Sequence, residues 1–181
     1  FGFRTKLSSS MALLELTEEI SKAMDNKNFT VGVFIDLAKA FDTVNHKILL
    51  EKLNHYGVRG TTNEWFKSYL ENRKQFVEVN SISSSYSSIS CGVPQGSILG
   101  PLLFILYIND LNSISEKLRT IMFADDTNLF MTGKNLDEIK LQLNEELKIF
   151  TTWFHANLLS LNVYKTYYIV FSNRVVSSKI D

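Results

Sequence analysis

Two neighbouring aspartates, Asp125 and Asp126, constrain the fold of this chain more than any other feature. They interrupt two short segments, 121–124 and 127–131, that are rich in apolar and β-branched residues, which is typical of strands. Strands separated by only two residues form a tight hairpin. Because both flanks are apolar, we expect the hairpin to belong to a core sheet. The sequence therefore predicts a central hairpin whose very tight turn is Asp125 and Asp126.

The other segments mix helical and strand patterns along the chain. Helices are expected over 11–24, over 48–56 with Gly57 closing it, from a Thr61 cap to 70, from Pro101 to 108, and from an Asn135–Glu138 capping pair to 154. Strands are expected over 31–36 and 167–171, with a two-stranded ribbon between 76 and 89 flanking a serine-rich loop at 81–88. This order predicts an α+β fold, with helices packed on an antiparallel sheet, rather than a doubly wound parallel fold.

Composition narrows the class of protein. Hydrophobic residues make up 45% of the 181 residues, which is enough for a sizeable core in one domain, or one domain and a piece. A net charge of +0 argues against a simple polyanion binder. A single cysteine, Cys91, forms no internal disulfide and favours an intracellular setting. The most apolar run, 98–111, is too short to span a membrane, and no signal-peptide pattern is present.

Three carboxylates are candidates for chemistry. Asp36 ends the predicted strand 31–36, and if that strand lies beside the hairpin, Asp36, Asp125 and Asp126 converge. Clustered carboxylates repel one another unless a cation lies between them, and oxygen ligands select Mg²⁺ or Mn²⁺ over zinc. Two such ions are the usual machinery of nucleotidyl transfer. An Asp-Asp pair alone is more often a solvated turn, but the apolar flanks favour the catalytic interpretation here.

The histidines give no second metal site. His46, His55 and His155 show no metal-ligand spacing with one another or with Cys91. We therefore expect them to be structural or exposed.

Five segments, in order, resemble the sequence motifs of the non-LTR retrotransposon reverse transcriptases. They are FGFR at 1–4, the motif between fingers and palm; IDLAKAFD at 35–42, motif A; GVPQGSILGP at 92–101, motif B; FADD at 123–126, motif C; and LSLNVYKT at 159–166, motif D. Together they cover nearly the whole chain in the order and spacing of that family. The resemblance implies a right-hand polymerase palm, an antiparallel sheet with helices on one face, with partial fingers and no thumb.

The resemblance also implies roles for the carboxylates. Asp36 and Asp125 would be ligands of two Mg²⁺ ions, for which Mn²⁺ can substitute, with Asp126 as an auxiliary carboxylate. The Leu37 carbonyl would assist as a metal ligand. Lys165 would lie near the leaving pyrophosphate as a charge stabiliser or general acid, although a solvated lysine at a strand start is an equal alternative.

Further roles concern the nucleic acid and the nucleotide. The resemblance implies that Phe41 lies under the sugar of the incoming nucleotide, where its ring would exclude a 2′-hydroxyl and favour deoxynucleotides. Gln95 and Gly96 would lie against the nucleotide and the template base. Arg4 would lie near the template, or could equally be a surface arginine. The implied partners are an RNA template, a DNA primer and dNTPs, with no membrane; the oligomeric state is left open.

The resemblance divides the chain into parts of one reverse transcriptase domain. Residues 1–30 are expected to be partial fingers and the fingers–palm helix, and 31–181 the palm with fingers helices inserted at about 44–90. The chain is expected to be a fragment that is inactive alone, acting in nucleus and cytoplasm as a ribonucleoprotein. Two alternatives remain open. One is a group II intron or retron type reverse transcriptase, and the other is an inactive remnant that only binds RNA.

Overall fold

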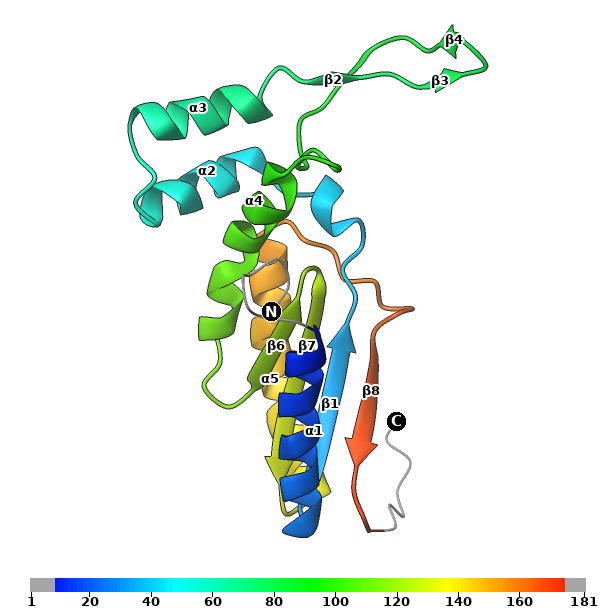
Figure 1. Ribbon diagram of the computed structural model, residues 1–181. Coiled ribbons are helices and arrows are strands. Elements are labelled where there is room, and N and C mark those ends of the chain that lie inside the picture. The colour runs from blue at the N-terminus through cyan, green and yellow to red at the C-terminus, as the bar shows by residue number, and fades with distance from the viewer. Residues whose placement is uncertain (1–8, 175–181) are drawn as a thin grey trace. The chain divides into compact units, whose positions relative to one another are not determined.

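The computed structural model describes residues 9–174, which fall into two compact units (Figure 1). The first consists of the chain up to Ala38, Asp110–Ala156 and the residues from Ser160 onward, and the second consists of Lys39–Asn109 with Asn157–Leu159. Within 9–174, no helix combines the length and apolar character that crossing a membrane requires. The assignment of particular segments to fingers and palm stays a prediction.

A four-stranded antiparallel sheet forms the centre of the first unit. Its strand order is β6-β7-β1-β8, so β1 lies between two neighbours and β8 is at the edge (Figure 1). The strands are β1 (Phe29–Ile35), β6 (Arg119–Phe123), β7 (Asp126–Gly133) and β8 (Tyr167–Phe171). The near-continuous apolar sequence of β1 suits a strand that is covered on both faces. The sheet and its helices confirm the predicted α+β fold.

Helices cover both faces of this sheet, with α1 (Ser9–Asp25) in front and α5 (Leu136–Ala156) behind it in Figure 1. Val31 and Val33 of β1 line a small cavity with Leu143 and Leu147 of α5. Alternate strand residues point to opposite faces, and Thr30 of β1 accordingly lines a different cavity, with α1 residues. The predicted layer of helices on one face of the sheet is thus α5. Helix α1 forms a second layer, on the opposite face (Figure 1).

The start of α5 has the capping pair that the sequence predicts. The side-chain oxygen of Asn135 accepts a hydrogen bond from the backbone N–H of Asp137 at 2.9 Å, and its amide donates to Glu138 at 3.3 Å. The first of these hydrogen bonds pairs one of the backbone N–H groups that a helix start leaves without a partner in the helix, and the second fixes the Asn135 side chain.

Helices dominate the second unit. They are η1 (Ala40–Asp42), α2 (His46–His55), α3 (Thr61–Leu70) and α4 (Leu99–Ile108). η2 (Asn109–Ser113) follows α4 and from Asp110 onward is part of the first unit. Leu49, Leu53, Leu70 and Phe104 are fully buried. As predicted, Gly57 follows the end of α2 with a positive φ, and Pro101 lies in the first turn of α4. The predicted Thr61 cap is wrong: Gly60, with φ of 58°, is the N-cap, and Thr61 is already helical.

A ribbon of four short strands projects from the second unit (Figure 1). β2 (Lys74–Gln75) pairs with β5 (Ser87–Ser88), and β3 (Glu78–Val79) pairs with β4 (Ile82–Ser83). The ribbon turns at Asn80 and Ser81, which both have positive φ, as two-residue hairpins require. The expected serine-rich loop over 81–88 is therefore wrong in part, because three of its six serines, Ser83, Ser87 and Ser88, lie on the returning strands.

Candidate active site

The hairpin between β6 and β7 presents two carboxylates, but its turn is one residue earlier than the sequence suggests. Phe123 pairs with Asp126, so the two turn residues are Ala124 and Asp125, and Asp126 begins β7. Ala124 has φ of 54°, a left-handed conformation in which glycine is the usual residue. The predicted turn at Asp125 and Asp126 is wrong for this reason, since alanine gives no signal for such a position.

The third carboxylate follows the strand next to this hairpin. Ile35, the last residue of β1, pairs with Thr127 of β7. The next residue, Asp36, is therefore at the same level of the sheet as Asp126. The antiparallel register of β1 and β7 therefore brings the two chain segments together at one end of the sheet. This is the convergence that the sequence predicted for neighbouring strands.

The segment 160–166 fixes the backbone around Asp36. The Asn162 N–H donates to the Asp36 carbonyl at 2.8 Å, and the Ala38 N–H donates to the Ser160 carbonyl at 2.8 Å. The Asp36 N–H also donates to the Thr166 hydroxyl at 3.5 Å. Asn162 and Thr166 thus position Asp36, a role that the sequence analysis missed. The only signal for it was that both residues lie in the segment resembling motif D.

The electrostatics of the cluster are visible at Asp126. Withdrawal of its carboxylate from water raises the pKa of Asp126 above the ordinary value, and the negative charges of Asp125 and then Asp36 raise it further. The residue remains exposed at the hairpin, so water still screens much of this repulsion. Asp125 and Asp36 are nevertheless near enough for their charges to act on Asp126.

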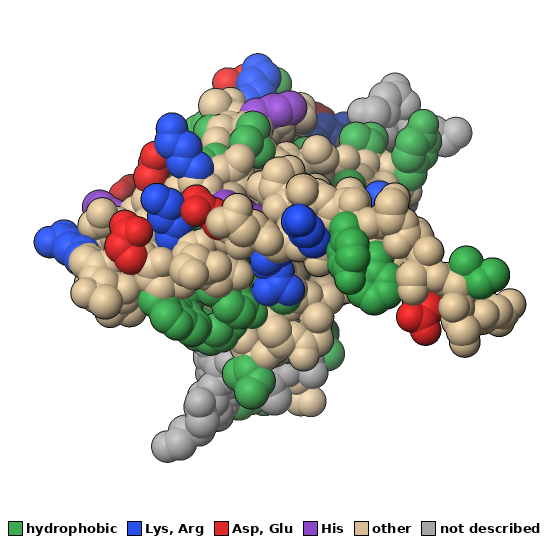
Figure 2. Space-filling model, turned by 90° about the horizontal axis from the view of Figure 1, so that it is seen from above, with side chains coloured by type: hydrophobic (Ala, Val, Ile, Leu, Met, Phe, Trp, Pro, Cys, Tyr) green, Lys and Arg blue, Asp and Glu red, His purple; other side chains and the backbone are tan. Residues whose placement is uncertain are grey.

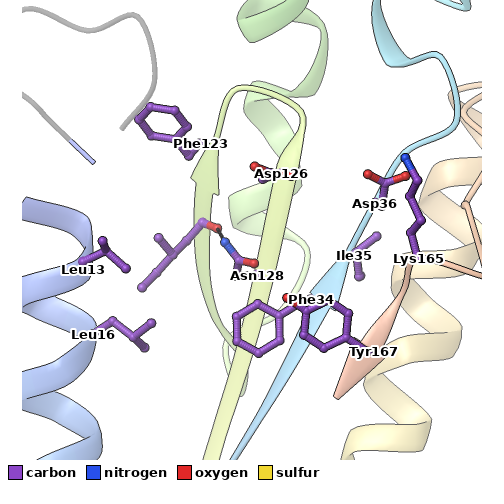
Figure 3. Close-up of a pocket in the computed structure, with 11 residues that line it drawn as sticks. Leu13, Leu16, Phe34, Ile35, Asp36, Phe123, Asp126, Asn128, Lys165 and Tyr167 are labelled. Carbon is purple, nitrogen blue, oxygen red and sulfur yellow. Dashed lines mark hydrogen bonds between the residues drawn. The ribbon is translucent and has the colours of Figure 1, made fainter. Parts of the chain in front are cut away.

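A cavity of about 660 Å³ opens beside these carboxylates. Figure 3 shows Asp36 and Lys165 on one side of it, Asp126 on the hairpin, and Leu13 and Leu16 of α1 facing them. The lining also includes Phe34 and Tyr167, whose rings stack with centroids 5.0 Å apart. Asn128, which donates to the Ile121 carbonyl at 3.4 Å, is a lining residue that the sequence analysis missed. The cavity therefore has an apolar floor and a charged rim.

The donor atoms at this rim suit a hard divalent cation. Leu37 and Leu161 face each other in an antiparallel β-bridge, and the hydrogen bonds of this bridge are formed by their neighbours in the chain. The bridge therefore uses neither the N–H nor the C=O of Leu37. Carboxylates and this carbonyl offer oxygen only, which favours Mg²⁺ or Mn²⁺. Among residues 9–174, however, no three His, Cys, Asp or Glu side chains lie close enough together to enclose one metal ion. The donor chemistry fits the ion, whereas the side chains stand apart.

Phe41, Gln95 and Gly96 belong to the second unit and form a group of their own. The ring of Phe41 packs on that of Phe104 of α4, with centroids 4.5 Å apart. The Gln95 amide donates to the Asp42 carboxylate at 2.7 Å. Gly96 is exposed and has φ of 80°. Asp42 is thus a further residue that the sequence analysis did not single out, and it holds the amide of Gln95.

Backbone hydrogen bonds join the two segments that carry this group. The Val93 N–H donates to the Phe41 carbonyl at 2.8 Å, and the Gly92 N–H donates to the Val44 carbonyl at 2.7 Å. At Gly92 a Cβ atom would come within 2.7 Å of the Asp42 carbonyl oxygen, and φ is 86°. Only glycine permits this close approach. The motif B loop is therefore held against the segment after motif A.

The histidines are structural or exposed, as predicted. His46 is buried, and its Nε2 lies 2.7 Å from the Gly92 carbonyl oxygen; since a carbonyl only accepts, this nitrogen carries the proton. His55 and His155 are exposed. Cys91 is a free, exposed thiol. The predicted template residue Arg4 lies outside the described residues.

The charges on the surface are mixed. Figure 2 shows Lys and Arg side chains interspersed with Asp and Glu on the face in view, without a field of a single sign. This agrees with the net charge of +0. Affinity for a polyanion would therefore have to come from local groups rather than from the overall charge.

Comparisons with known proteins give one consistent answer. A family model described as reverse transcriptase (RNA-dependent DNA polymerase) matches residues 1–177. The chain is 34% identical over 92% of its length to a probable RNA-directed DNA polymerase from transposon BS, and 32% identical over 98% to that from mobile element jockey, both of Drosophila melanogaster. It spans only 19% and 20% of those two relatives.

The fold has a counterpart among solved structures. A telomerase of Candida tropicalis, determined with a fragment of telomeric RNA, superimposes with a TM-score of 0.68 over 91% of this chain and 30% of that one. Its sequence identity is 13%, so the likeness concerns the fold alone. It confirms the predicted palm-like architecture.

Proposed function

The chain belongs to the reverse transcriptase (RNA-dependent DNA polymerase) family, and from that premise we propose that it is the palm, with part of the fingers, of an RNA-directed DNA polymerase of a non-LTR mobile element. The reaction would join a dNTP to a primer 3′-hydroxyl on an RNA template. Because the two mobile-element relatives match nearly the whole chain, we favour this over an intron or retron enzyme.

The observation that carries the proposal is the position of Asp36, Asp125 and Asp126 at neighbouring strand ends, where partial burial and then the charges of Asp125 and Asp36 raise the pKa of Asp126. In the proposal, Asp36, Asp125 and the Leu37 carbonyl hold two Mg²⁺ ions, with Asp126 as an auxiliary carboxylate. Bound magnesium would neutralise the developing charge of the phosphoryl group during transfer. The protein's own part is to keep these oxygens on rigid strand ends.

The remaining site residues serve the nucleotide and the template. In the proposal, the Phe41 ring, supported by Phe104, excludes the 2′-hydroxyl of a ribonucleotide. Gln95, whose amide is held by Asp42, and Gly96 contact the nucleotide and the template base. Lys165, which lines the same cavity as Asp36, stabilises charge on the leaving pyrophosphate. Arg4 contacts the template strand.

The wider setting is part of the proposal. The chain spans about a fifth of its mobile-element relatives, and we propose that it works as one part of a longer polymerase and is inactive alone. We place its action in a ribonucleoprotein in nucleus and cytoplasm. The rival is a remnant that binds RNA without catalysis.

Primer extension tests this proposal. The chain, within its complete reading frame, is assayed on a poly-A RNA template with a short DNA primer, dTTP and Mg²⁺. We expect extension by the parent protein and a loss of at least about a hundredfold in Asp125→Asn, since such electrostatic groups contribute effects of that size.

Asp137→Asn is the matched control, because Asp137 is an exposed aspartate in the first turn of α5. It should extend the primer at the parental rate. Equal rates in the parent and Asp125→Asn would refute the role of the carboxylates. No extension by a folded parent protein would favour the RNA-binding remnant.

A further inference from the structure

An ordered row of planar side chains runs along one face of α3 and beyond its end. Trp65 and Tyr69 are four residues apart on α3, which places them on one side of the helix, and Arg73 follows the end of the helix. The Trp65 and Tyr69 rings stack with centroids 5.7 Å apart and an interplanar angle of 12°. The Arg73 guanidinium lies 5.6 Å from the centre of the Tyr69 ring. We call these three residues the aromatic row.

The row is open to solvent at its tryptophan. Trp65 is 52% exposed, although burial of a large aromatic ring is strongly favourable. Its other ring contact within the described residues is the edge-to-face one with Phe66, with centroids 5.1 Å apart. About half of an already stacked indole is therefore open to solvent, where another flat group can reach it.

The charged side chains of α3 itself lie away from the aromatic row. Glu64 and Lys67 of α3 and the flanking Glu71 line a cavity with α2 residues such as Asn54, and no residue of the aromatic row lines that cavity. At its far end the row has Arg73, and Lys74 follows it in the chain. The charged group in contact with the rings is therefore the Arg73 guanidinium, although the chain as a whole is neutral.

We propose that the aromatic row binds single-stranded RNA, with a base stacked on Trp65 and a phosphate contacted by Arg73. Aromatic faces stack on any base, and an arginine that is stacked on a ring keeps its N–H edge for phosphate. A protein partner would be expected to cover apolar side chains instead, such as Val79 and Ile82 of the ribbon, which are 62% and 75% exposed. The RNA partner rests on the proposed function, but this binding needs neither metal nor catalysis.

The test measures binding of a fluorescently labelled single-stranded oligouridylate by anisotropy, without Mg²⁺ and without dNTP. We expect Trp65→Ala to weaken binding on the order of tenfold, the typical effect of losing one stacked base. Trp65→Phe should retain most of the affinity, because it keeps a ring. Arg73→Ala should lower the slope of log affinity against log salt concentration by about one.

A spectroscopic arm reports stacking directly. Trp153→Phe leaves Trp65 as the one tryptophan of the chain, which has two. RNA should quench its emission, and thermal melts would check that this variant and Trp65→Ala remain folded. Quenching without RNA-dependent anisotropy change, or affinity unchanged in folded Trp65→Ala, would overturn the proposal.

Ile82→Ser is the matched control, since Ile82 is an exposed apolar residue outside the row. It should bind RNA as the parent chain does, and an equal loss in Ile82→Ser would contradict the proposal. If Trp65→Ala instead abolishes self-association in sedimentation and leaves RNA affinity intact, the row is a contact between copies and the proposal fails. Asp125→Asn separates the two functions: it should bind normally, so a failed polymerase assay leaves this outcome unaffected.

Discussion

At the scale of single residues, the site is shaped by repulsion among like charges. Partial burial of Asp126, with the charges of Asp125 and Asp36, makes its folded form hold a proton more tightly than the unfolded chain does. A carboxyl with a raised pKa opposes folding once it is ionised. The site is therefore less stable at neutral pH without a cation than its packing alone would make it.

The Asp126→Asn variant tests whether the ionised Asp126 side chain lowers the stability of the fold. The penalty is absent below the ordinary pKa of 3.8 and appears as pH rises through the raised pKa of the folded state. We therefore expect Asp126→Asn to be more stable than the parent at pH 7, by roughly a few tenths of a kcal/mol for so exposed a site. The two should converge below pH 3.8. Thermal melts across this range measure it, and a less stable variant at pH 7 would contradict the sign.

The residues that the sequence reveals are those whose side chains carry the chemistry. Asp36 and the Asp125–Asp126 pair could be found because carboxylates at strand ends are unusual. The turn could not be placed, because Ala124 adopts a positive φ that its side chain does not favour. Asn162 and Thr166 were missed because their role depends on pairing with a segment more than a hundred residues away.

At the scale of elements, one buried charge holds α5 to the loop before β6. Glu146 of α5 is only 5% exposed and forms an ion pair with Lys117 at 3.2 Å. A hydrogen bond from Ser115, and the hydrogen bond and charge of Lys117, lower the pKa of Glu146 against the opposing effect of burial. The ionised form of Glu146 therefore stabilises the first unit.

Glu146→Gln should lose this contribution while keeping the side chain's shape. Because the folded pKa is lowered, the stability is present above the ordinary value of 4.5 and is lost as pH falls through the folded pKa. We expect a loss of roughly 1–3 kcal/mol at pH 7, and almost none at low pH. Urea unfolding at both pH values measures it. Glu145→Gln, which removes an exposed partner of Lys148, should change little. Equal effects of the two variants would contradict this account.

The element boundaries show where local pattern suffices. The α-helices and the four strands of the central sheet were predictable from periodicity, and Asn135 and Glu138 marked the start of α5. The 3-10 helices η1 and η2 were not predicted. The start of α3 was misjudged, because Gly60 caps it through its backbone conformation rather than through a side chain. Three of the six serines at 81–88 lie on strands, because the chain turns at Asn80 and Ser81 rather than along the whole serine-rich segment.

At the scale of the whole molecule, the order of the motifs was more informative than composition. A net charge of +0 argued against nucleic-acid binding, whereas five ordered segments indicated the family that the matching model over 1–177 confirms. The aromatic row offers a physical reason why neutral composition and an RNA partner can coexist. Its positive charge is local, because the Arg73 guanidinium lies over the Tyr69 ring while the charged side chains of α3 itself line a separate cavity. Such a division depends on the tertiary structure and could not be predicted from charge counts.

Manganese binding is the most direct test of the central claim that Asp36, Asp125 and Asp126 together form a divalent-cation site. Mn²⁺ is titrated into the 181-residue chain, and the free ion is followed by its electron paramagnetic resonance signal. We predict saturable binding that is lost in Asp36→Asn and in Asp125→Asn and kept in Asp137→Asn, with Mg²⁺ as a competitor. Mn²⁺ binding of equal strength in all four proteins, or in none while the chain is folded, would contradict the claim.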